Sequence, residues 1–378
     1  TLLLFVPFIN STVSDLSNLL SLLSATIILL FLGIKDDLVL MTAKKKFVIQ
    51  LIAVSMVCLL QDVRITDFHG LLGVYELPYF VSILFTVFVF VLVINSVNLI
   101  DGIDGLAATI SILASFAFGT AFFIANDFMM TLLSAVLIGS LLGFLKYNFS
   151  EDRKIFMGDC GSLIVGFLLA YQGIKFLNIN PENVRFYNAN NSSILLLAIL
   201  SYPLFDLLRV FIVRMMQKKS PFLADSNHIH HRLLRLGLNH KQSTFLLFVS
   251  NLTLIIITFF TSDLQINISL IVVVCFGCLL YLLPFLGVFE EFEAKEIVAD
   301  GSNKKQNIFS NNNLNSKVFS SENEVEENVI RLINLENSNG VESVFETQNK
   351  NLTSKRVQEI RTWSSKKKSN ISGDISKI

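Results

Sequence analysis

Residues 95–107, NSVNLIDGIDGLA, place amide and carboxylate side chains at intervals of three residues directly after a long apolar run. The row consists of Asn95, Asn98, Asp101 and Asp104. Its successive members are neighbours on a helix, with a drift of about 60° at each step. Gly102 and Gly105 let the backbone bend and let a ligand approach closely. Such a row can accept protons or bind a cation, whereas an aspartate-capped helix N-terminus is the structural alternative.

Two shorter acidic motifs accompany this row. Asp36 and Asp37 in GIKDDL cannot face the same way on a helix, so one carboxylate can meet a ligand while the other supports it. Carboxylates this close repel each other when both are charged, which suits a proton acceptor. Asp159 in KIFMGDCGS stands just before an apolar segment. It is placed either to cap a helix or to hold Mg²⁺ against diphosphate oxygens.

Three of the five histidines are clustered in ADSNHIHHRLLRLG, as His228, His230 and His231. Zinc ligation is one interpretation, but no second group of ligands stands at zinc spacing and no cysteine lies nearby. Imidazole and guanidinium donors, including those of Arg232 and Arg235, fit a diphosphate better. We interpret the two other histidines, His69 and His240, as ordinary surface residues.

These motifs must be positioned by membrane helices, because 52% of the 378 residues are hydrophobic, 34 are Phe and only 16% are charged. Segments that can cross an apolar core of about 30 Å are predicted at residues 16–34, 46–61, 79–97, 106–125, 129–146, 161–177, 193–213, 243–261 and 267–289. The sequence thus predicts an all-α, polytopic integral membrane protein with about nine complete transmembrane helices. The balanced total of 30 basic and 30 acidic residues gives no indication of a nucleic-acid partner.

Basic residues divide the loops into two sets. One set contains Lys35, Lys44, Lys45, Lys46, Lys146, Arg153, Lys154, Arg214, Lys218, Lys219, Arg232, Arg235 and Lys241. The loops of the other set contain only two basic residues, Arg64 and Arg185. The first set is therefore predicted to be cytoplasmic, and all four polar motifs fall on that side. Ionisable groups at membrane ends are costly, so this agreement favours a functional site over scattered structural residues.

The two ends of the chain differ from this membrane region. Residues 1–289 are interpreted as the membrane-embedded domain, and residues 290–378, rich in Asn, Ser, Lys and Glu, as a polar, disordered cytoplasmic tail. The opening TLLLFVPFIN resembles the last turns of a further span, so we expect upstream sequence. Cys275 and Cys278 lie in an apolar run, where a small hydrophobic role is expected.

Together, the motifs DD, NxxNxxDGxDGL, FMGDxGS and HIHH resemble the polyprenyl-phosphate N-acetylhexosamine-1-phosphate transferases, a membrane family that includes phospho-N-acetylmuramoyl-pentapeptide transferase. The resemblance covers roughly residues 16–289, and HIHH is closer to the N-acetylhexosamine branch. It implies about eleven spans in the bacterial plasma membrane and transfer of a sugar 1-phosphate, here GlcNAc-1-phosphate, from a UDP-sugar to undecaprenyl phosphate with release of UMP. It also implies Mg²⁺, with Mn²⁺ as a substitute, while a homodimer stays open.

By the same resemblance, the site residues carry roles from the family. The catalytic residues are Asp36, Asp37, Asp101 and Asp104; the metal ligands are Asn98 and Asp159; the substrate-binding residues are Asn148, Phe156, His228, His230, His231 and Arg232. Phe156 matches an aromatic that stacks on uracil, and Asn148 is a uracil-side candidate. Where the family commonly has Arg, this chain has Ser226, so one phosphate contact is either lost or supplied by Arg232.

Two alternatives from other classes explain part of the pattern. A transporter for an anionic lipid or nucleotide sugar could use the same polar cluster, but transporter sites usually lie near the bilayer midplane between repeats. Here the carboxylates stand at span ends and no internal repeat is evident. A scaffold that recruits partners through the tail leaves the motifs without a role.

Overall fold

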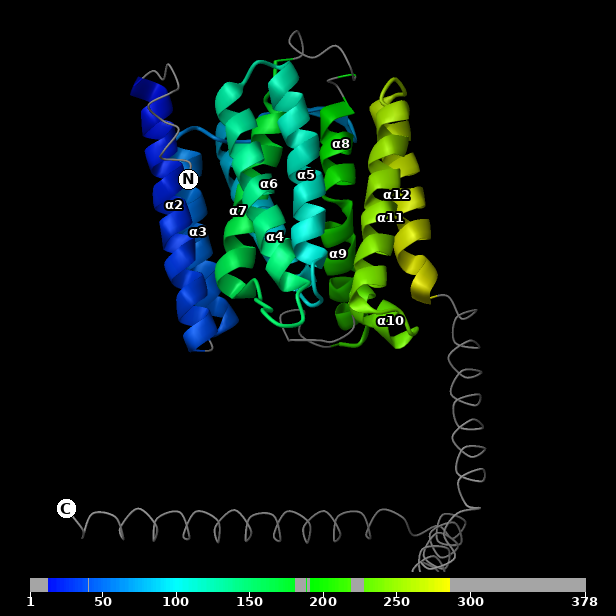
Figure 1. Cartoon of the computed structure of the whole chain (residues 1–378). Helices are drawn as coiled ribbons and strands as arrows, with labels where there is room; N and C mark the ends of the chain where they lie inside the picture. The colour runs from blue at the N-terminus through cyan, green and yellow to red at the C-terminus, as the bar shows by residue number, and fades with distance from the viewer. Residues whose placement is uncertain (1–12, 40, 181–187, 189–190, 219–227, 286–378) are drawn as a thin grey trace, which may run out of the picture. The chain divides into compact units, whose positions relative to one another are not determined.

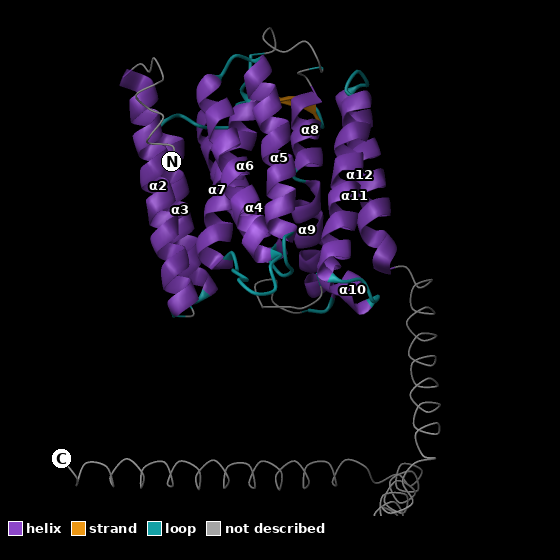
Figure 2. Ribbon diagram, viewed as in Figure 1, coloured by secondary structure: helices purple, strands orange, loops and turns teal. Residues whose placement is uncertain are grey.

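The chain folds into a bundle of helices that run side by side (Figures 1 and 2). The computed structural model describes residues 13–39, 41–180, 188, 191–218 and 228–285. In order along the chain, its elements are α2 (Val13–Leu38), α3 (Ala43–Leu60), β1 (Asp67–Leu71), β2 (Val74–Glu76), α4 (Tyr79–Ile100), α5 (Leu106–Ile124), α6 (Phe128–Asn148), α7 (Gly158–Leu177), α8 (Ser192–Ile199), α9 (Ser201–Met216), α10 (Ile229–Arg235), α11 (His240–Phe260), α12 (Ile266–Leu282) and the 3₁₀ turn η4 (Leu283–Phe285). The predicted polytopic helical fold is confirmed.

Among the described residues, seven helices are long and apolar enough to cross a membrane, or eight if the bent pair α8 and α9 counts as one span. The predicted count of about nine was therefore too high by this measure. The segment that falls short is α3, since its first turn carries Lys44, Lys45 and Lys46 and only residues 47–60 are free of charge. It still forms a helix at the predicted place, packed against α2 and α4.

The predicted single span at residues 193–213 is instead two helices, α8 and α9, bent by 75°. Pro203 cannot donate a backbone hydrogen bond to Ile199. Asn251 of α11 satisfies the broken turn, since its Nδ2 donates to Ile199 O at 3.1 Å and its Oδ1 accepts from Tyr202 N at 3.1 Å. Backbone groups freed inside a membrane need such partners, so the buried amide makes the bend tolerable.

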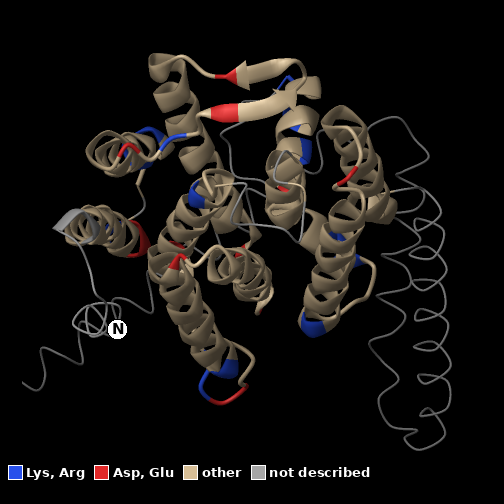
Figure 3. Cartoon of the chain, turned by 90° about the horizontal axis from the view of Figure 1, so that it is seen from above, with Lys and Arg blue, Asp and Glu red and all other residues tan. Residues whose placement is uncertain are grey.

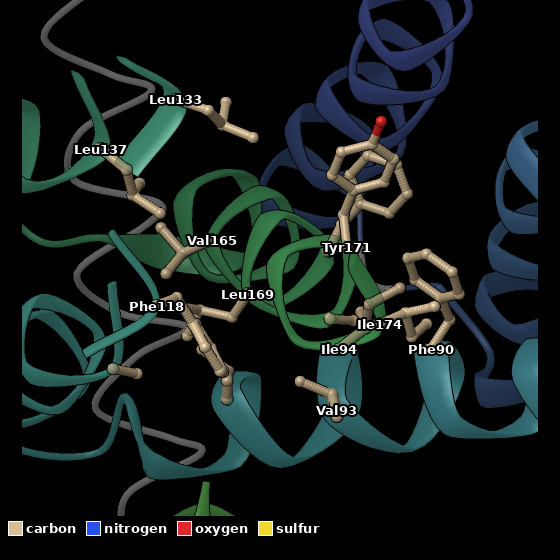
Figure 4. Packing of buried hydrophobic residues seen from close by; sticks show 14 of the residues in the cluster. Phe90, Val93, Ile94, Phe118, Leu133, Leu137, Val165, Leu169, Tyr171 and Ile174 are labelled. Atoms are coloured by element: carbon tan, nitrogen blue, oxygen red, sulfur yellow. The ribbon is translucent and has the colours of Figure 1, made fainter. Parts of the chain in front are cut away.

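Helix α7 lies at the centre of the larger apolar core. It packs against α2, α4 and α5, and its two ends reach both ends of the bundle. Figure 4 shows Leu169 and Ile174 of α7 among side chains from α4, α5 and α6, including Phe90 and Phe118. Phe90 stacks on Phe167 with ring centroids 5.6 Å apart. A helix surrounded in this way is a rigid support for the residues at its N-terminus.

A short antiparallel hairpin, β1 and β2, interrupts the helical pattern between α3 and α4. The analysis of the sequence did not predict it. Gly70 and Gly73 adopt positive φ angles of 84° and 81° at its turn. The hairpin contacts α8 and α12, and it lies at the end of the bundle opposite α10 (Figure 1).

Charged residues are confined to short pieces of the chain, as Figure 3 shows with most of the ribbon uncharged. The boundary predicted at residues 289/290 and the tail that follows it lie outside the described residues. The described fold therefore concerns the membrane region, whose α10 end carries the four polar motifs.

Candidate active site

The N-terminus of α7 is joined to the DD motif at the end of α2. Asp37 Oδ1 accepts from the backbone N–H of Asp159 at 3.0 Å, and its Oδ2 accepts from that of Cys160 at 3.2 Å. These N–H groups belong to the first turn of α7, which has no partners within its own helix. Asp37 thus satisfies this helix end from another element and fixes the position of Asp159.

Its neighbour Asp36 faces the other way, as the sequence predicted for adjacent carboxylates. Its side chain is only 2% exposed and forms an ion pair with Lys46 of α3. Asp36 Oδ1 also accepts from Met41 N at 2.8 Å. The Lys46 ammonium lies 2.8 Å from Asp159 Oδ2 as well, so a single cation bridges two carboxylates from different helices.

Asn98 of α4 completes this group. Its Nδ2 donates to Asp159 Oδ1 at 2.7 Å and to Ser162 Oγ at 2.8 Å. The side-chain oxygen of Asn98 is therefore the atom left for a ligand. The predicted metal ligands Asn98 and Asp159, which are 61 residues apart in the chain, are in direct contact.

Asp101 lies between α4 and α5, just beyond the end of the membrane-spanning helix. Burial, followed by the negative charges of Asp159, Asp104 and Asp37, raises the pKa of Asp101 to about 7. A carboxyl group that titrates near neutral pH is suited to exchange a proton during a reaction. Among the acidic residues of the site, Asp101 has the properties of a general base.

Asp104 has the opposite environment. Lys154 Nζ lies 2.7 Å from Asp104 Oδ2, and His240 Nδ1 lies 2.8 Å from the same oxygen. Burial alone would raise the pKa of Asp104, but the hydrogen bonds from these two side chains outweigh it and hold the pKa below its usual value. His240 lies at the surface as predicted, with its side chain 45% exposed, but it is not an ordinary surface residue, because the fold brings it to an acid 136 residues earlier in the chain.

The connection between α6 and α7 lies on the other side of residues 101–105, the acidic loop that joins α4 to α5. Asn148 is buried; its Oδ1 accepts from Gly105 N at 2.6 Å and its Nδ2 donates to Ile155 O at 2.8 Å. These contacts give Asn148 a role in positioning the loop, while its predicted contact with uracil stays a prediction. Phe156 is 75% exposed, with the Lys154 ammonium 5.3 Å from the ring centroid. An exposed aromatic ring beside a cation fits a platform for a nucleotide base.

The three clustered histidines differ in their surroundings. His228 is buried, and its Nδ1 lies 3.0 Å from Oδ2 of Asp206 on α9. His230 is fully buried, and burial lowers its pKa to about 3, so that its ring is neutral. His231 is only half-buried, and burial followed by the nearby His228 and Arg235 lowers its pKa. Of the three, His231 is the most accessible to a substrate.

His230 also joins the histidine motif to the acidic loop. A Cβ atom at Gly102 would lie 2.3 Å from His230 Nε2, so the ring packs directly on this glycine. At the far end of the same loop, Gly105 adopts a φ of 74°, and a Cβ atom there would lie 2.1 Å from Phe149. The two glycines of the DGIDG sequence are thus required by close approach and by backbone conformation.

The predicted phosphate contact of Arg232 remains a prediction. Arg232 lies on α10, and its Nε donates to Pro284 O at 3.2 Å, beside the end of α12. Asp225 and Ser226, where the chain departs from the common form of the motif, lie outside the described residues.

The oxygen-rich group around Asp159 fits a hard divalent cation. Asp36 and Asp159 attract a cation already, because the Lys46 ammonium lies between them. Within the described residues, no three His, Cys, Asp or Glu side chains converge as a metal cage. Mg²⁺ typically takes one or two carboxylates and completes its shell with water and substrate phosphates, so a small protein ligand set is compatible with it.

Comparisons with known proteins find similarity to sugar-phosphate transferases. Residues 19–177 match the model of glycosyl transferase family 4. The chain is 35% identical over 223 residues to a probable undecaprenyl-phosphate N-acetylglucosaminyl 1-phosphate transferase of Bacillus subtilis, covering 59% of this chain and 60% of that protein. It is 33% identical over 248 residues to a decaprenyl-phosphate N-acetylglucosaminephosphotransferase of Mycobacterium leprae, covering 62% of each.

A third relative comes from the other branch of the predicted family. The chain is 38% identical over 129 residues to a phospho-N-acetylmuramoyl-pentapeptide-transferase of Clostridium acetobutylicum, covering 33% of this chain and 40% of that protein. Since the chain spans about three fifths of the first two relatives, their names describe proteins that are longer than the matched region.

Proposed function

We propose that the chain is a polyprenyl-phosphate sugar-1-phosphate transferase, since residues 19–177 match the model of glycosyl transferase family 4 and the motifs resemble the same class of enzyme. The donor is a UDP-N-acetylhexosamine, in first place UDP-GlcNAc, and the acceptor is undecaprenyl phosphate. The observation that carries the proposal is the convergence of Asp36, Asn98, Asp101 and Asp159 from α2, α4 and α7 at one end of a membrane bundle. Two relatives are named for transfer of this sugar phosphate to a polyprenyl phosphate.

In the proposed reaction, a phosphate oxygen of undecaprenyl phosphate attacks the β-phosphorus of the UDP-sugar. A new P–O bond forms, the bond from the β-phosphorus to the bridging oxygen breaks, and UMP leaves with that oxygen. The products are undecaprenyl diphosphate sugar and UMP. If the acceptor phosphate carries a proton, Asp101 accepts it, since the pKa of Asp101 is about 7.

The other residues bind and orient. Asp37 holds the first turn of α7, and Asn98 orients Asp159. His231 faces the diphosphate, and Phe156 stacks on the uracil. Asp159 and Asn98 would hold Mg²⁺, which would supply positive charge to neutralise the diphosphate. These assignments follow the chemistry of each side chain and its accessibility in the bundle.

We place this end of the bundle in the cytoplasm, because the loops at this end carry nearly all of the lysines and arginines that stand in loops. A UDP-sugar is made and kept in that compartment. The position of the acids at the helix ends also argues against the transporter alternative, whose site would be expected near the midplane of the bilayer.

The proposal is tested with membranes that contain the chain, incubated with radiolabelled UDP-GlcNAc, undecaprenyl phosphate and Mg²⁺. We expect a labelled lipid that yields GlcNAc on mild acid hydrolysis, UMP in equal amount, and loss of both products with EDTA. Asp62→Asn is the matched control, because Asp62 is an exposed acid paired with Arg64 at the opposite end of α3. Label transfer that is independent of undecaprenyl phosphate, or UDP-GlcNAc uptake without chemistry, would contradict the proposal.

A further inference from the structure

His240 contacts the acidic loop from the first residue of α11. Its Nδ1 lies 2.8 Å from Asp104 Oδ2, and Lys154 Nζ lies 2.7 Å from the same oxygen. The two donors come from two different elements that both follow Asp104 in the sequence, one from the segment before α7 and one from the start of α11. Two charge-assisted hydrogen bonds to one oxygen restrict how the carboxylate can rotate.

The start of α11 is itself held firmly in place. Asn239 and Gln242 form a capping box, in which Asn239 Oδ1 accepts from Gln242 N at 2.8 Å and Gln242 Oε1 accepts from Asn239 N at 3.0 Å. One turn later, Thr244 Oγ1 donates to the backbone oxygen of Asp104 at 2.9 Å. The helix start thus contacts both the side chain and the main chain of the same acid.

This contact differs from an ordinary surface ion pair. Such a pair usually contributes little, because solvent screens it and two flexible side chains must be ordered. The side chain of Asp104 is only 18% exposed, and the backbone contact of Thr244 orders the partner without help from the ion pair. The His230 ring meets the same loop at Gly102, two residues before Asp104. The histidine segment and the acidic loop therefore touch at two separate points.

We propose that His240 is a positioning residue of the transfer reaction, which together with Lys154 fixes the orientation of the Asp104 carboxylate. Through this contact, His240 holds the acidic loop and the histidine motif in a fixed position relative to each other, so that the side chains of both face the substrate. The inference rests on the proposed function, and its geometry can be tested without turnover. Neither the motif pattern nor the names of the relatives point to this residue.

The first test compares kinetic constants of purified full-length variants. His240→Ala should lower kcat at least 10-fold while the KM for the UDP-sugar changes less than 3-fold, because Asp104 loses its orientation and the nucleotide platform is untouched. His240→Asn, whose amide can still donate to Asp104, should recover a substantial part of the loss. Imidazole added to His240→Gly should raise kcat, since the side chain of His240 is 45% exposed and its space is open to solvent.

Gln242→Ala is the matched control. It removes one half of the capping box in the same turn of α11 but leaves the contact between His240 and Asp104. We expect a lower melting temperature with kcat within 2-fold of the original chain. If His240→Ala also keeps kcat within 2-fold, or if Gln242→Ala reduces kcat as much as His240→Ala does, the inference is wrong.

A double-mutant cycle separates this inference from the proposed function. Melting temperatures of His240→Ala, Asp104→Asn and the double variant should be non-additive, with His240→Ala adding little once Asp104→Asn is present; Asp104→Asn still costs stability after His240→Ala, because it also removes the partner of Lys154. If the original chain shows no sugar-phosphate transfer, the proposed function fails, while this cycle still tests the contact. Additive effects would overturn the inference whatever the activity.

Discussion

Replacing Asp101 by Asn separates the stability of the site from its chemistry. Burial and the negative charges of Asp159, Asp104 and Asp37 raise the pKa of Asp101 to about 7, against 3.8 in a free chain. Above pH 7 the folded protein must therefore carry an ionised carboxylate in an unfavourable place. Asp101→Asn removes this cost, so the variant should be more stable than the original chain at pH 8.5, and by about half as much at pH 5.5, since the cost develops between the unfolded pKa of 3.8 and the folded pKa of about 7.

The size of the effect follows from the shift in pKa. At about 1.4 kcal/mol for each pKa unit, a rise from 3.8 to about 7 corresponds to at most roughly 4 kcal/mol at high pH. Local relaxation and water reduce this to about 1–2 kcal/mol, or a rise of roughly 2–8 °C in melting temperature. Because the pKa of Asp101 is raised on folding, the stability of the original chain is not reduced by this group below pH 4. It decreases as the pH increases from about 4 to the folded pKa of about 7.

The assay is thermal unfolding of the purified chain in detergent at the two pH values, together with transfer activity. Asp101→Asn should abolish transfer because the amide cannot accept a proton. Asp104→Asn is the comparison of opposite sign, since the pKa of Asp104 is held down by Lys154 and His240 and its ionised form stabilises the fold. A lower melting temperature for Asp101→Asn at pH 8.5, or transfer at the original rate, would refute the reasoning.

Four further predictions concern the proposed metal site, the acidic loop, the bend between α8 and α9, and the orientation of the chain in the membrane. Asp159→Asn should reduce transfer more than 100-fold and weaken its dependence on Mg²⁺ concentration, because an amide attracts a hard cation poorly. Gly102→Ala should reduce transfer about 10-fold or more at normal expression, since its Cβ would meet a histidine ring 2.3 Å away. Asn251→Leu leaves the backbone of the bend without partners, which should cost about 2–4 kcal/mol and lower the melting temperature by roughly 5–10 °C. An impermeant thiol reagent on intact cells should label Asn188→Cys and spare Asp152→Cys, and reversed labelling would overturn the assigned orientation.

Much of the fold could be predicted because membrane helices are read from continuous apolar runs. The predicted start of α4 at Tyr79 and that of α5 at Leu106 agree with the structure, since a polar or glycine-rich segment precedes each run. The bend between α8 and α9 could not be predicted in the same way. Pro203 gave a signal, but whether a helix tolerates a break depends on a partner such as Asn251, which lies on another helix.

The site was predictable to the extent that its acids follow recognisable spacing. The contact between Asn98 and Asp159 fits their expected role as a pair. The cations were missed: Lys46 was counted only as a basic loop residue, and His240 was assigned to the surface. Lys46 contacts Asp159 over a separation of 113 residues and His240 contacts Asp104 over 136, and a single sequence gives no information on such distant pairings.

The roles of the four site aspartates differ because their partners differ. Asp36 and Asp159 share the Lys46 ammonium, and Asp104 receives Lys154 and His240, so each of these three acids has a cationic or hydrogen-bonding partner. Within the described part of the chain, no hydrogen bond or ion pair of this kind is formed by the side chain of Asp101, which faces the negative charge of its neighbours. Environments that separate the proton affinities of neighbouring acids also assign their chemistry. In the proposed reaction, the paired acids would attract the metal and the donors that orient the diphosphate, and Asp101, with a pKa of about 7, is left as the acid that can change its protonation state near neutral pH.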